Sequence, residues 1–496
     1  MDTDELIEES DQLLNNNNNN KNMTTTMDQD NNIDSDDLIE KPTPAKRRGR
    51  APKKAATKEK KTTKKTTTSA ATIKRKKDND INKGYDKKRT LELAEKYPDT
   101  YWKYHADSDL NMISTINEGN QLESIPSNIS DQGAITSMTL SNNGFLLATF
   151  STVGSIKIWD IENGFELIRK IRDKDEPNID EFFCGHFVED VPDIIIAGGK
   201  LKDRQRWSED DGDNHILPCP LKIFSLETGK LLGKLEGHNE EILSIKAVQF
   251  NGDNYYISSS EDGHIIKWKM ADDWITLIES HRMVDELTCM AFTISFLPNT
   301  GNKYFMAACD EHLRLYDFET NQLLQTFENL YTSYCDCGKF IKWLDESQYW
   351  ESVKKEEGYN NKDSGQQYAW FITRGAELCD VSEGVSSKPN SCILHKLNYP
   401  TVDNEEFTLD EIKRYQHEEY HSNSWFVKVT SNGRYLLAPT IYGQIFVFNI
   451  LTGQTTAILK EHQDIEVRDV IFHPYRPLIF SSGDDGIVKV YSYKEN

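Results

Sequence analysis

A histidine, a serine and an aspartate, residue types that can transfer protons or attack substrates, occur close together in one stretch of the chain. His238, Ser260 and Asp262 lie within residues 237–269, and Trp268 follows them. Buried polar side chains in folded proteins are normally paired with one another, because an unpaired polar group is costly to bury. We therefore expect His238 and Asp262 to have a structural rather than a catalytic role.

Other motifs that carry chemistry are few. Cys335 and Cys337 are separated by one residue, which is too close for the usual zinc pair, and no partner pair accompanies them. The sequence has no phosphate-binding loop, nucleophile elbow or metal-binding helix. No nucleophile with a neighbouring base can be named. We expect a binding protein rather than an enzyme, with no metal, no cofactor and no small-molecule substrate.

Cysteine usage and hydropathy limit the compartment. The eight cysteines show no framework spacing, so we expect reduced thiols in a cytosolic or nuclear protein. Residues 1–40 are acidic and have no apolar core, which argues against a signal peptide. No later segment offers the roughly 20 apolar residues that span a bilayer, so we expect no membrane association.

The charge changes sign sharply after Glu40. Residues 1–40 are rich in Asn and hold twelve acids against one Lys, whereas residues 41–89 hold twenty Lys and Arg against four acids. We expect both segments to be disordered. A basic arm on a chain of net charge −23 is suited to holding a polyanion at one end. The residues expected to bind nucleic acid or to direct nuclear import are Lys46, Arg47, Arg48, Arg50, Lys53, Lys54, Lys74, Arg75, Lys76 and Lys77.

The first basic cluster is similar to an AT-hook, in which an Arg-Gly-Arg-Pro core lies along the minor groove of DNA. Here Ala51 separates Arg50 from Pro52. This departure puts base preference in doubt and leaves phosphate binding intact. The two clusters together also look like a bipartite or doubled import signal. We expect a nuclear protein, with nucleolar or cytoplasmic localisation and a merely solvated tail as the alternatives.

The stretch from residue 237 to residue 269 also has the pattern of a small sheet. Alternating apolar runs predict strands at Ile242–Phe250, Tyr255–Ser259 and His264–Trp268, separated by turn signals. A Gly-His pair this far before a Trp resembles the WD40 repeat, the four-stranded blade of a β-propeller. The resemblance implies a hydrogen-bonded tetrad within the blade, formed by His238, Ser260, Asp262 and Trp268.

One blade cannot bury its own faces, so the pattern should recur. We find seven residues in the Trp position, which are Trp159, Phe224, Trp268, Tyr316, Cys379, Phe448 and Tyr491. The fold class expected is all-β, a single WD40-type propeller of seven blades; a six-bladed or irregular ring is the alternative. Cys379 marks the weakest repeat, because it replaces the aromatic residue. An acid precedes the third strand of some repeats, as Asp262 does, but Val153 and Tyr442 take that place in two others.

Closure of the ring needs one more strand, because the sequence ends directly after the third strand of the last repeat. Leu110–Asn117 alternates in hydropathy and is the candidate, with Glu118–Gly133 as the following loop; an ordinary linker is the alternative. The propeller would then occupy residues 110–496. Residues 90–109 contain four aromatic side chains and are expected to dock on the ring or on a partner.

Three spacings between repeats are long, and polar inserts account for them at Lys200–Pro220, Asp345–Gln366 and Thr401–Tyr420. The resemblance implies that the first and third inserts share the narrow top face. A capping box, Thr408–Glu411, predicts a short helix over Leu409–Glu419. Acids in both inserts suggest a basic peptide ligand, with solvated loop charge as the alternative. The expected contact residues are Trp207, Asp210, Asp211, Glu405, Glu406, Asp410 and Glu411.

These expectations describe a non-enzymatic scaffold or adaptor, nuclear and linked to chromatin or transcription, with an arm for nucleic acid and a ring for protein partners. The alternative is a ribosome-assembly factor that binds RNA and basic ribosomal proteins. A substrate receptor of a cullin-type ubiquitin ligase is less favoured. Such receptors often carry Arg two residues after a Trp-Asp pair, whereas Trp159-Asp160 is followed by Ile161 and Glu162.

Overall fold

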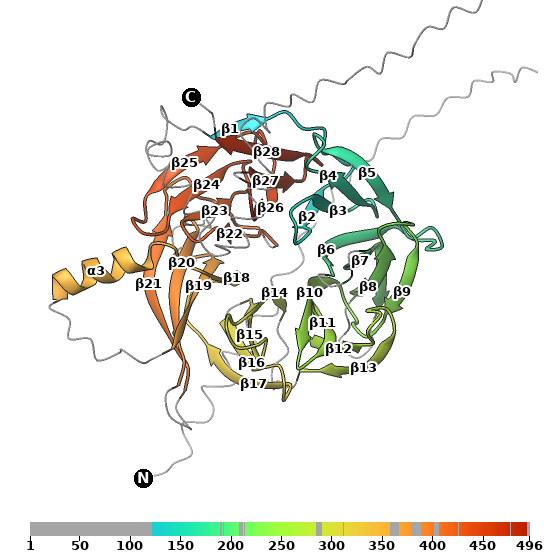
Figure 1. Ribbon diagram of the computed structural model, residues 1–496, viewed down its shortest axis with the longest axis horizontal. Coiled ribbons are helices and arrows are strands. Elements are labelled where there is room, and N and C mark those ends of the chain that lie inside the picture. Colours follow the sequence, from blue (N-terminus) through green and yellow to red (C-terminus); the bar gives the residue numbers. More distant parts are fainter. Residues whose placement is uncertain are drawn as a thin grey trace, which may run out of the picture. The chain divides into compact units, whose positions relative to one another are not determined.

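Seven four-stranded antiparallel sheets surround a central axis (Figure 1). The computed structural model describes residues 122–493 except for the internal gaps 189–190, 192, 208–211, 213, 284–289, 311, 358–366, 378–387, 401–405, 425 and 477. This part of the chain is a seven-bladed β-propeller, which confirms the expected fold class and blade number. The segments expected at residues 1–40, 41–89 and 90–109, and with them every basic residue of the arm, lie outside the described residues.

Each blade begins at an inner strand beside the axis and ends at an outer one. Blades one to three are formed by β2 (Ile135–Leu140), β3 (Leu146–Ser151), β4 (Ile156–Asp160), β5 (Glu166–Ile171); β6 (Asp180–Phe187), β7 (Ile194–Trp207), β8 (Asn214–Ser225), β9 (Leu231–Leu235); β10 (Ile242–Phe250), β11 (Asp253–Ser260), β12 (Ile265–Met270) and β13 (Leu277–Arg282).

Blades four to seven follow the same order. They are formed by β14 (Ala291–Phe296), β15 (Tyr304–Cys309), β16 (His312–Asp317), β17 (Gln322–Phe327); β18 (Cys335–Ile341), β19 (Tyr368–Gly375), β20 (Ser391–Asn398), β21 (Thr408–Gln416); β22 (Thr430–Ser431), β23 (Tyr435–Pro439), β24 (Ile445–Asn449), β25 (Thr455–Leu459); and β26 (Val467–Phe472), β27 (Leu478–Gly483), β28 (Val488–Tyr493) and β1 (Leu122–Ile125).

Local sequence explains the strands of blade three. β10 and β11 are joined by Asn251 and Gly252, whose φ angles of 52° and 87° form the left-handed turn that suits the twist of a hairpin. The first strand has the predicted bounds, Ile242–Phe250. Its apolar side chains alternate with polar ones because successive residues point to opposite faces of the sheet.

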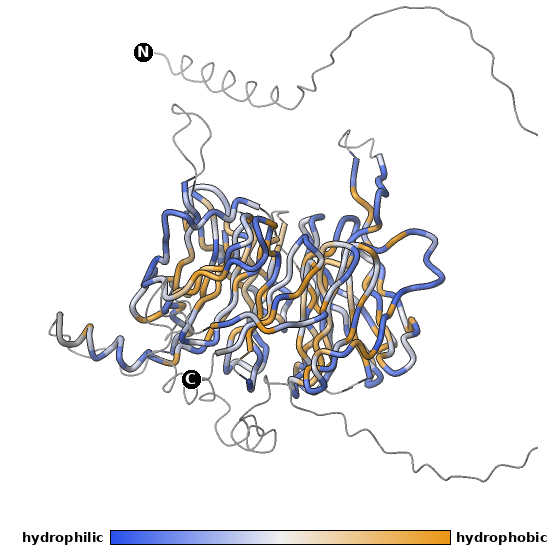
Figure 2. Tube along the Cα trace, turned by 90° about the horizontal axis from the view of Figure 1, so that it is seen from above, coloured by the Kyte–Doolittle hydropathy of each residue, from blue (hydrophilic) through white to orange (hydrophobic). Residues whose placement is uncertain are grey.

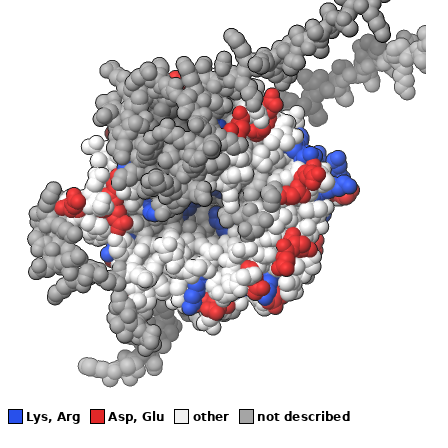
Figure 3. Space-filling view, in the orientation of Figure 1, with Lys and Arg blue, Asp and Glu red and all other residues white. Residues whose placement is uncertain are grey.

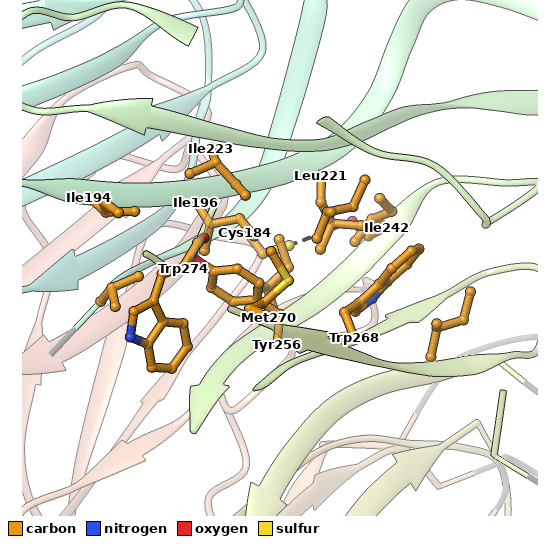
Figure 4. Close-up of a cluster of buried hydrophobic side chains, with 14 residues drawn as sticks. Cys184, Ile194, Ile196, Leu221, Ile223, Ile242, Tyr256, Trp268, Met270 and Trp274 are labelled. Carbon is orange, nitrogen blue, oxygen red and sulfur yellow. Dashed lines mark hydrogen bonds between the residues drawn. The ribbon is translucent and has the colours of Figure 1, made fainter. Parts of the chain in front are cut away.

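Apolar side chains fill the space between neighbouring blades, where most of the core lies. Between blades two and three, Ile196 and Ile223 meet Ile242, Tyr256 and Trp268, all of them no more than 2% exposed (Figure 4). The same kind of cluster joins blade one to blade seven. Each sheet is therefore buried on both faces by its neighbours, and the ring is stable only when it is closed.

The strand that closes the ring is β1, not the predicted segment. β1 pairs antiparallel with β28, with Leu122 opposite Tyr493 and Ile125 opposite Val490. Leu110–Asn117 lies outside the described residues, and Leu122–Ile125 falls in the stretch predicted to be a loop. The sequence LESI is too short for a pattern of alternation, so its conformation depends on pairing with β28. The expectation that a segment before blade one completes blade seven is nevertheless confirmed.

The first polar insert lies between the second and third strands of its blade, as the resemblance implied, whereas the third folds differently from the prediction. Lys200–Pro220 extends β7 and β8 into a long hairpin that projects from the ring in the edge-on view (Figure 2). Thr408–Gln416 is the outer strand β21 instead of a helix, because its residues pair with β20, as Leu409 does with Leu397. Tertiary pairing thus overrides the local capping signal. The insert after β18 contains α3 (Glu346–Glu357), which projects at the rim of the ring (Figure 1).

The third strand of blade five was also misplaced. Cys379 lies outside the described residues, and the strand is β20, Ser391–Asn398. In blade three, Ser258 lies opposite Ile266, two residues before Trp268. In blade five, Thr373 lies opposite Ile393, so His395 occupies the Trp position. A search for Trp, Tyr or Phe at this position misses the strand, because a histidine stands there.

Candidate protein-binding face

The predicted tetrad of blade three is present, with one serine corrected. His238 Nδ1 lies 3.1 Å from Asp262, and its Nε2 lies 2.8 Å from the hydroxyl of Ser258. The indole of Trp268 donates to the same hydroxyl at 2.8 Å. The predicted Ser260 instead donates to the Glu240 carbonyl at 2.9 Å. Its position at the end of β11 puts it beyond the reach of the indole.

The tetrad is suited to structure rather than to catalysis. The side chain of His238 is 1% exposed, so no substrate reaches it from solvent. Burial raises the pKa of Asp262, but the hydrogen bond and charge of His238, together with the backbone amides of Asn239 and His264, outweigh burial and hold that pKa below its ordinary value. Blade seven repeats the arrangement, with His462 2.9 Å from Asp485 and 2.8 Å from Ser481.

These two blades decide the family. A sequence model described as "WD domain, G-beta repeat" matches residues 229–269 and 453–492, which contain both sets of histidine, serine and aspartate. The chain belongs to the WD40-repeat family. A search of curated proteins found no match to it. WD40 proteins are generally non-enzymatic scaffolds that bind protein partners.

The described part of this WD40 protein contains cysteines and other side chains of the types that can bind metal ions. Six cysteines are described, and all are buried and free. No group of three or more His, Cys, Asp or Glu side chains in the described residues could hold a metal ion. No helix among them is long and apolar enough to cross a membrane.

The predicted partner-binding residues do not come together. The upper face of the ring is formed by the loops that lead into each inner strand and by those that join second to third strands. Trp207, 59% exposed, ends β7 on the hairpin at this face. Glu406 precedes β21 and therefore belongs to the opposite, lower face. Asp410 and Glu411 lie on the outer strand itself. Asp210, Asp211 and Glu405 lie outside the described residues.

Other acids, missed in the sequence, lie on the upper face. They sit beside the repeat motifs, in the loops 236–241, 261–264, 460–466 and 484–487 of blades three and seven. These acids adjoin the Gly-His and Asp-Gly motifs of the repeat, so they are easily taken for part of the repeat pattern instead of a binding site. Their position after an outer strand or within a turn was the signal that could have found them. The acids are Glu236, Glu240, Glu241, Glu261, Glu461, Asp464, Glu466 and Asp484.

An acid–aromatic patch lies where blade six meets blade seven. Tyr442 is 52% exposed and Ile465 is 40% exposed, and both are in upper-face loops. The two loops touch, because a Cβ on Gly443 would lie only 2.7 Å from the backbone nitrogen of Asp464. Asp484 also belongs to the patch and lies 2.8 Å from Arg468. We call Tyr442, Asp464, Ile465 and Asp484 the blade six–seven patch.

A second acidic feature on the upper face is the pair formed by Glu241 and Glu261. Burial, and then the neighbouring Glu261, raise the pKa of Glu241 to about 8. Its Oε2 atom is buried without a hydrogen-bond partner in the described part of the chain. A positive charge brought close would favour ionisation of this carboxyl group, since an opposite charge stabilises the carboxylate.

Proposed function

We propose that this WD40 protein is a nuclear adaptor that holds a basic protein segment on its upper face and nucleic acid on residues 41–89. The observation that carries the proposal is the blade six–seven patch. It combines exposed apolar side chains with carboxylates on the face that the loops form. An aromatic anchor with acids around it suits a Lys- or Arg-rich segment that carries apolar residues.

The proposed nuclear location and the proposed binding of nucleic acid both rest on the charge of residues 41–89. Residues 41–89 hold twenty basic side chains against four acids, while the chain as a whole has a net charge of −23. An arm of this kind binds phosphates with little dependence on sequence. The histone tail is the basic segment most consistent with a nuclear protein that also holds DNA. A ribosome-assembly factor is the second candidate, because Ala51 weakens the likeness to a DNA-reading hook and leaves an arm that suits RNA equally.

Proximity labelling with the full-length protein distinguishes these roles. We expect labelled histones and chromatin proteins in nuclei, and we expect their yield to fall when Tyr442→Ala, Asp464→Asn and Asp484→Asn are combined. The matched control is Glu406→Gln with Glu411→Gln, which removes acids from the lower face and the rim. Labelling of ribosomal proteins would favour the second candidate. Labelling of cullin adaptors, or equal histone yield from both variants, would contradict the proposal.

A further inference from the structure

The inner strands enclose a cavity of about 590 Å³ along the axis of the propeller. This volume is in the range of sites that hold small molecules. Hydroxyl groups line much of its wall, from Ser137, Ser244, Thr293 and Thr430. The cavity is therefore polar, unlike the spaces between the blades.

Three lysines from different blades face this cavity. Lys246 comes from β10, Lys339 from β18 and Lys428 from the segment before β22. The acid that lines it is Asp469 of β26. In the face turned toward the viewer, Lys and Arg atoms are visible at the central hollow of the ring (Figure 3). The cavity thus carries more positive than negative charge.

Asp469 is already engaged. It accepts a hydrogen bond of 2.8 Å from the Met138 backbone and lies 3.8 Å from Lys428. Lys428 also donates to the carbonyls of Thr136 and Phe183 at 3.4 Å. By contrast, the ammonium groups of Lys246 and Lys339 have no hydrogen bond or ion pair within the described residues. Asp469 is the single acid among the described residues that line the cavity, so two of the three lysines have no carboxylate of their own.

The lysine charges in the cavity repel one another when no anion is bound. Burial, together with the charges of Lys339 and Lys428, lowers the pKa of Lys246 to about 8. His186 adds no positive charge, because burial and Lys246 lower its pKa to about 4 and leave it neutral. Like charges at close range in a low-dielectric wall repel one another, and a bound anion removes the repulsion.

Among the described residues, an apolar cluster covers the upper end of the cavity. At its upper end the apolar side chains of Phe183, Leu243, Phe292 and Phe426 pack together, each no more than 5% exposed. Three of these side chains sit at the irregular first step of an inner strand, as Leu243 does between Ile242 and Ser244. A bulge of this kind re-aims the residue that it leaves unpaired. The other end reaches Asn142 and Tyr475, in the lower-face turns of blades one and seven.

We propose that the lower mouth of the propeller admits a small, multiply phosphorylated molecule, whose phosphate groups are held by Lys246 and Lys339. Lysine is a point charge that suits phosphate, and several phosphates would match several separate ammonium groups. A nucleic-acid strand does not suit a cavity closed at one end, because such strands lie along open grooves. This site is independent of the upper face and of residues 41–89.

Chemical labelling of the full-length protein tests the site. Inositol hexakisphosphate and pyrophosphate serve as probes, and an amine acetylating reagent reports lysine accessibility by mass spectrometry. We expect either probe to protect Lys246 and Lys339 by about tenfold, as a charge-paired contact worth roughly 1.4 kcal/mol would. Protection of neither lysine by either probe would overturn the proposal. Protection by an acidic peptide alone would also overturn it, because the occupant would then be a protein segment.

A variant pair separates the cavity from the basic arm, which also binds polyanions. Lys246→Met with Lys339→Met removes the two charges, and Lys170→Met with Lys230→Met removes two exposed lysines from the outer side of the ring. Without a probe, we expect the cavity variant to melt no lower than the parent, because charge repulsion is relieved. With the probe, the melting temperature should rise in the parent and the control but not in the cavity variant. An equal rise in the cavity variant would overturn the site.

Discussion

His395 stands in blade five where Trp268 stands in blade three, and each side chain meets a hydroxyl of the second strand. The imidazole Nε2 lies 2.9 Å from Thr373, and the indole nitrogen lies 2.8 Å from Ser258. Tyr331 completes the blade-five group with a 2.9 Å contact to the same threonine. A blade without the family's usual residues thus keeps a buried hydrogen-bonded centre between its second and third strands.

Ser258, which takes the tetrad position predicted for Ser260, can be tested by comparing an alanine substitution at each of the two serines. Ser258→Ala would leave the indole nitrogen of Trp268 and the Nε2 atom of His238 without their partner, and burying unpaired polar groups costs about 1–3 kcal/mol. Ser260→Ala removes the bond to the Glu240 carbonyl and a longer one of 3.2 Å from the Asp262 amide, and it should cost about 1 kcal/mol. Denaturant unfolding measures both. A larger loss for Ser260→Ala would show that the tetrad has been misassigned.

Buried histidines should make the ring sensitive to acid. Burial lowers the pKa of His395 to about 3, and burial likewise lowers the pKa of His473 to about 3. In the unfolded chain both would titrate near 6.5, so the unfolded state binds more protons between these values and stability is lost as pH falls below about 6.5. From pH 7 to pH 5 we expect a loss of roughly 2 kcal/mol for each histidine.

This acid sensitivity is tested by the slope of the unfolding free energy against pH rather than by its value at one pH. His395→Gln removes one titrating group, so the dependence of unfolding free energy on pH should become shallower even if the variant is less stable at pH 7. An unchanged slope would mean that His395 does not become protonated on unfolding in this range.

Substitutions in β1 test whether this strand closes the ring. Leu122 and Ile125 are each 9% exposed in β1, so replacing both by Ser should remove about 2–4 kcal/mol of buried apolar contact and loosen blade seven. Glu123→Ser, on the exposed side of the same strand, is the matched control and should leave the melting temperature nearly unchanged. Equal melting temperatures for the two variants would rule out β1 as the closing strand.

The basic arm should bind nucleic acid through phosphates. Affinity for duplex DNA should fall steeply with salt, and replacing Lys46, Arg47, Arg48 and Arg50 by Ala should flatten the slope of log affinity against log salt by about 0.9 per lost contact. Lys170→Ala with Lys230→Ala, on the ring, should leave the slope unchanged. Strong preference for A·T over G·C duplexes would show that Ala51 does not weaken base reading.

Repetition explains what the sequence predicts well. Six blades keep an aromatic residue in the same register, and the turns between strands carry Gly at left-handed positions, so the ring and most strands can be anticipated. β20 is missed because His395 takes the place of the usual aromatic residue, and β21 is missed because a strand that is polar in sequence is held by pairing with its neighbour. Leu122–Ile125 is missed because four residues show no period.

The candidate sites are less visible in sequence for a different reason. Lys246 and Lys339 lie 93 positions apart, and nothing in the sequence distinguishes them from lysines on the surface. In the folded ring both line one cavity. Asp464 and Tyr442 likewise belong to different blades. Proximity between distant repeats depends on closure of the ring, which no local pattern encodes.

Titration of the full-length protein with a labelled histone-tail peptide tests the central claim, that the upper face holds a basic protein segment. The account predicts that Tyr442→Ala combined with Asp464→Asn and Asp484→Asn weakens binding by about tenfold or more, as loss of an anchor and its charges would. Glu406→Gln with Glu411→Gln should leave the affinity unchanged. Equal affinity in both variants, or a loss confined to the Glu406 and Glu411 variant, would contradict the account.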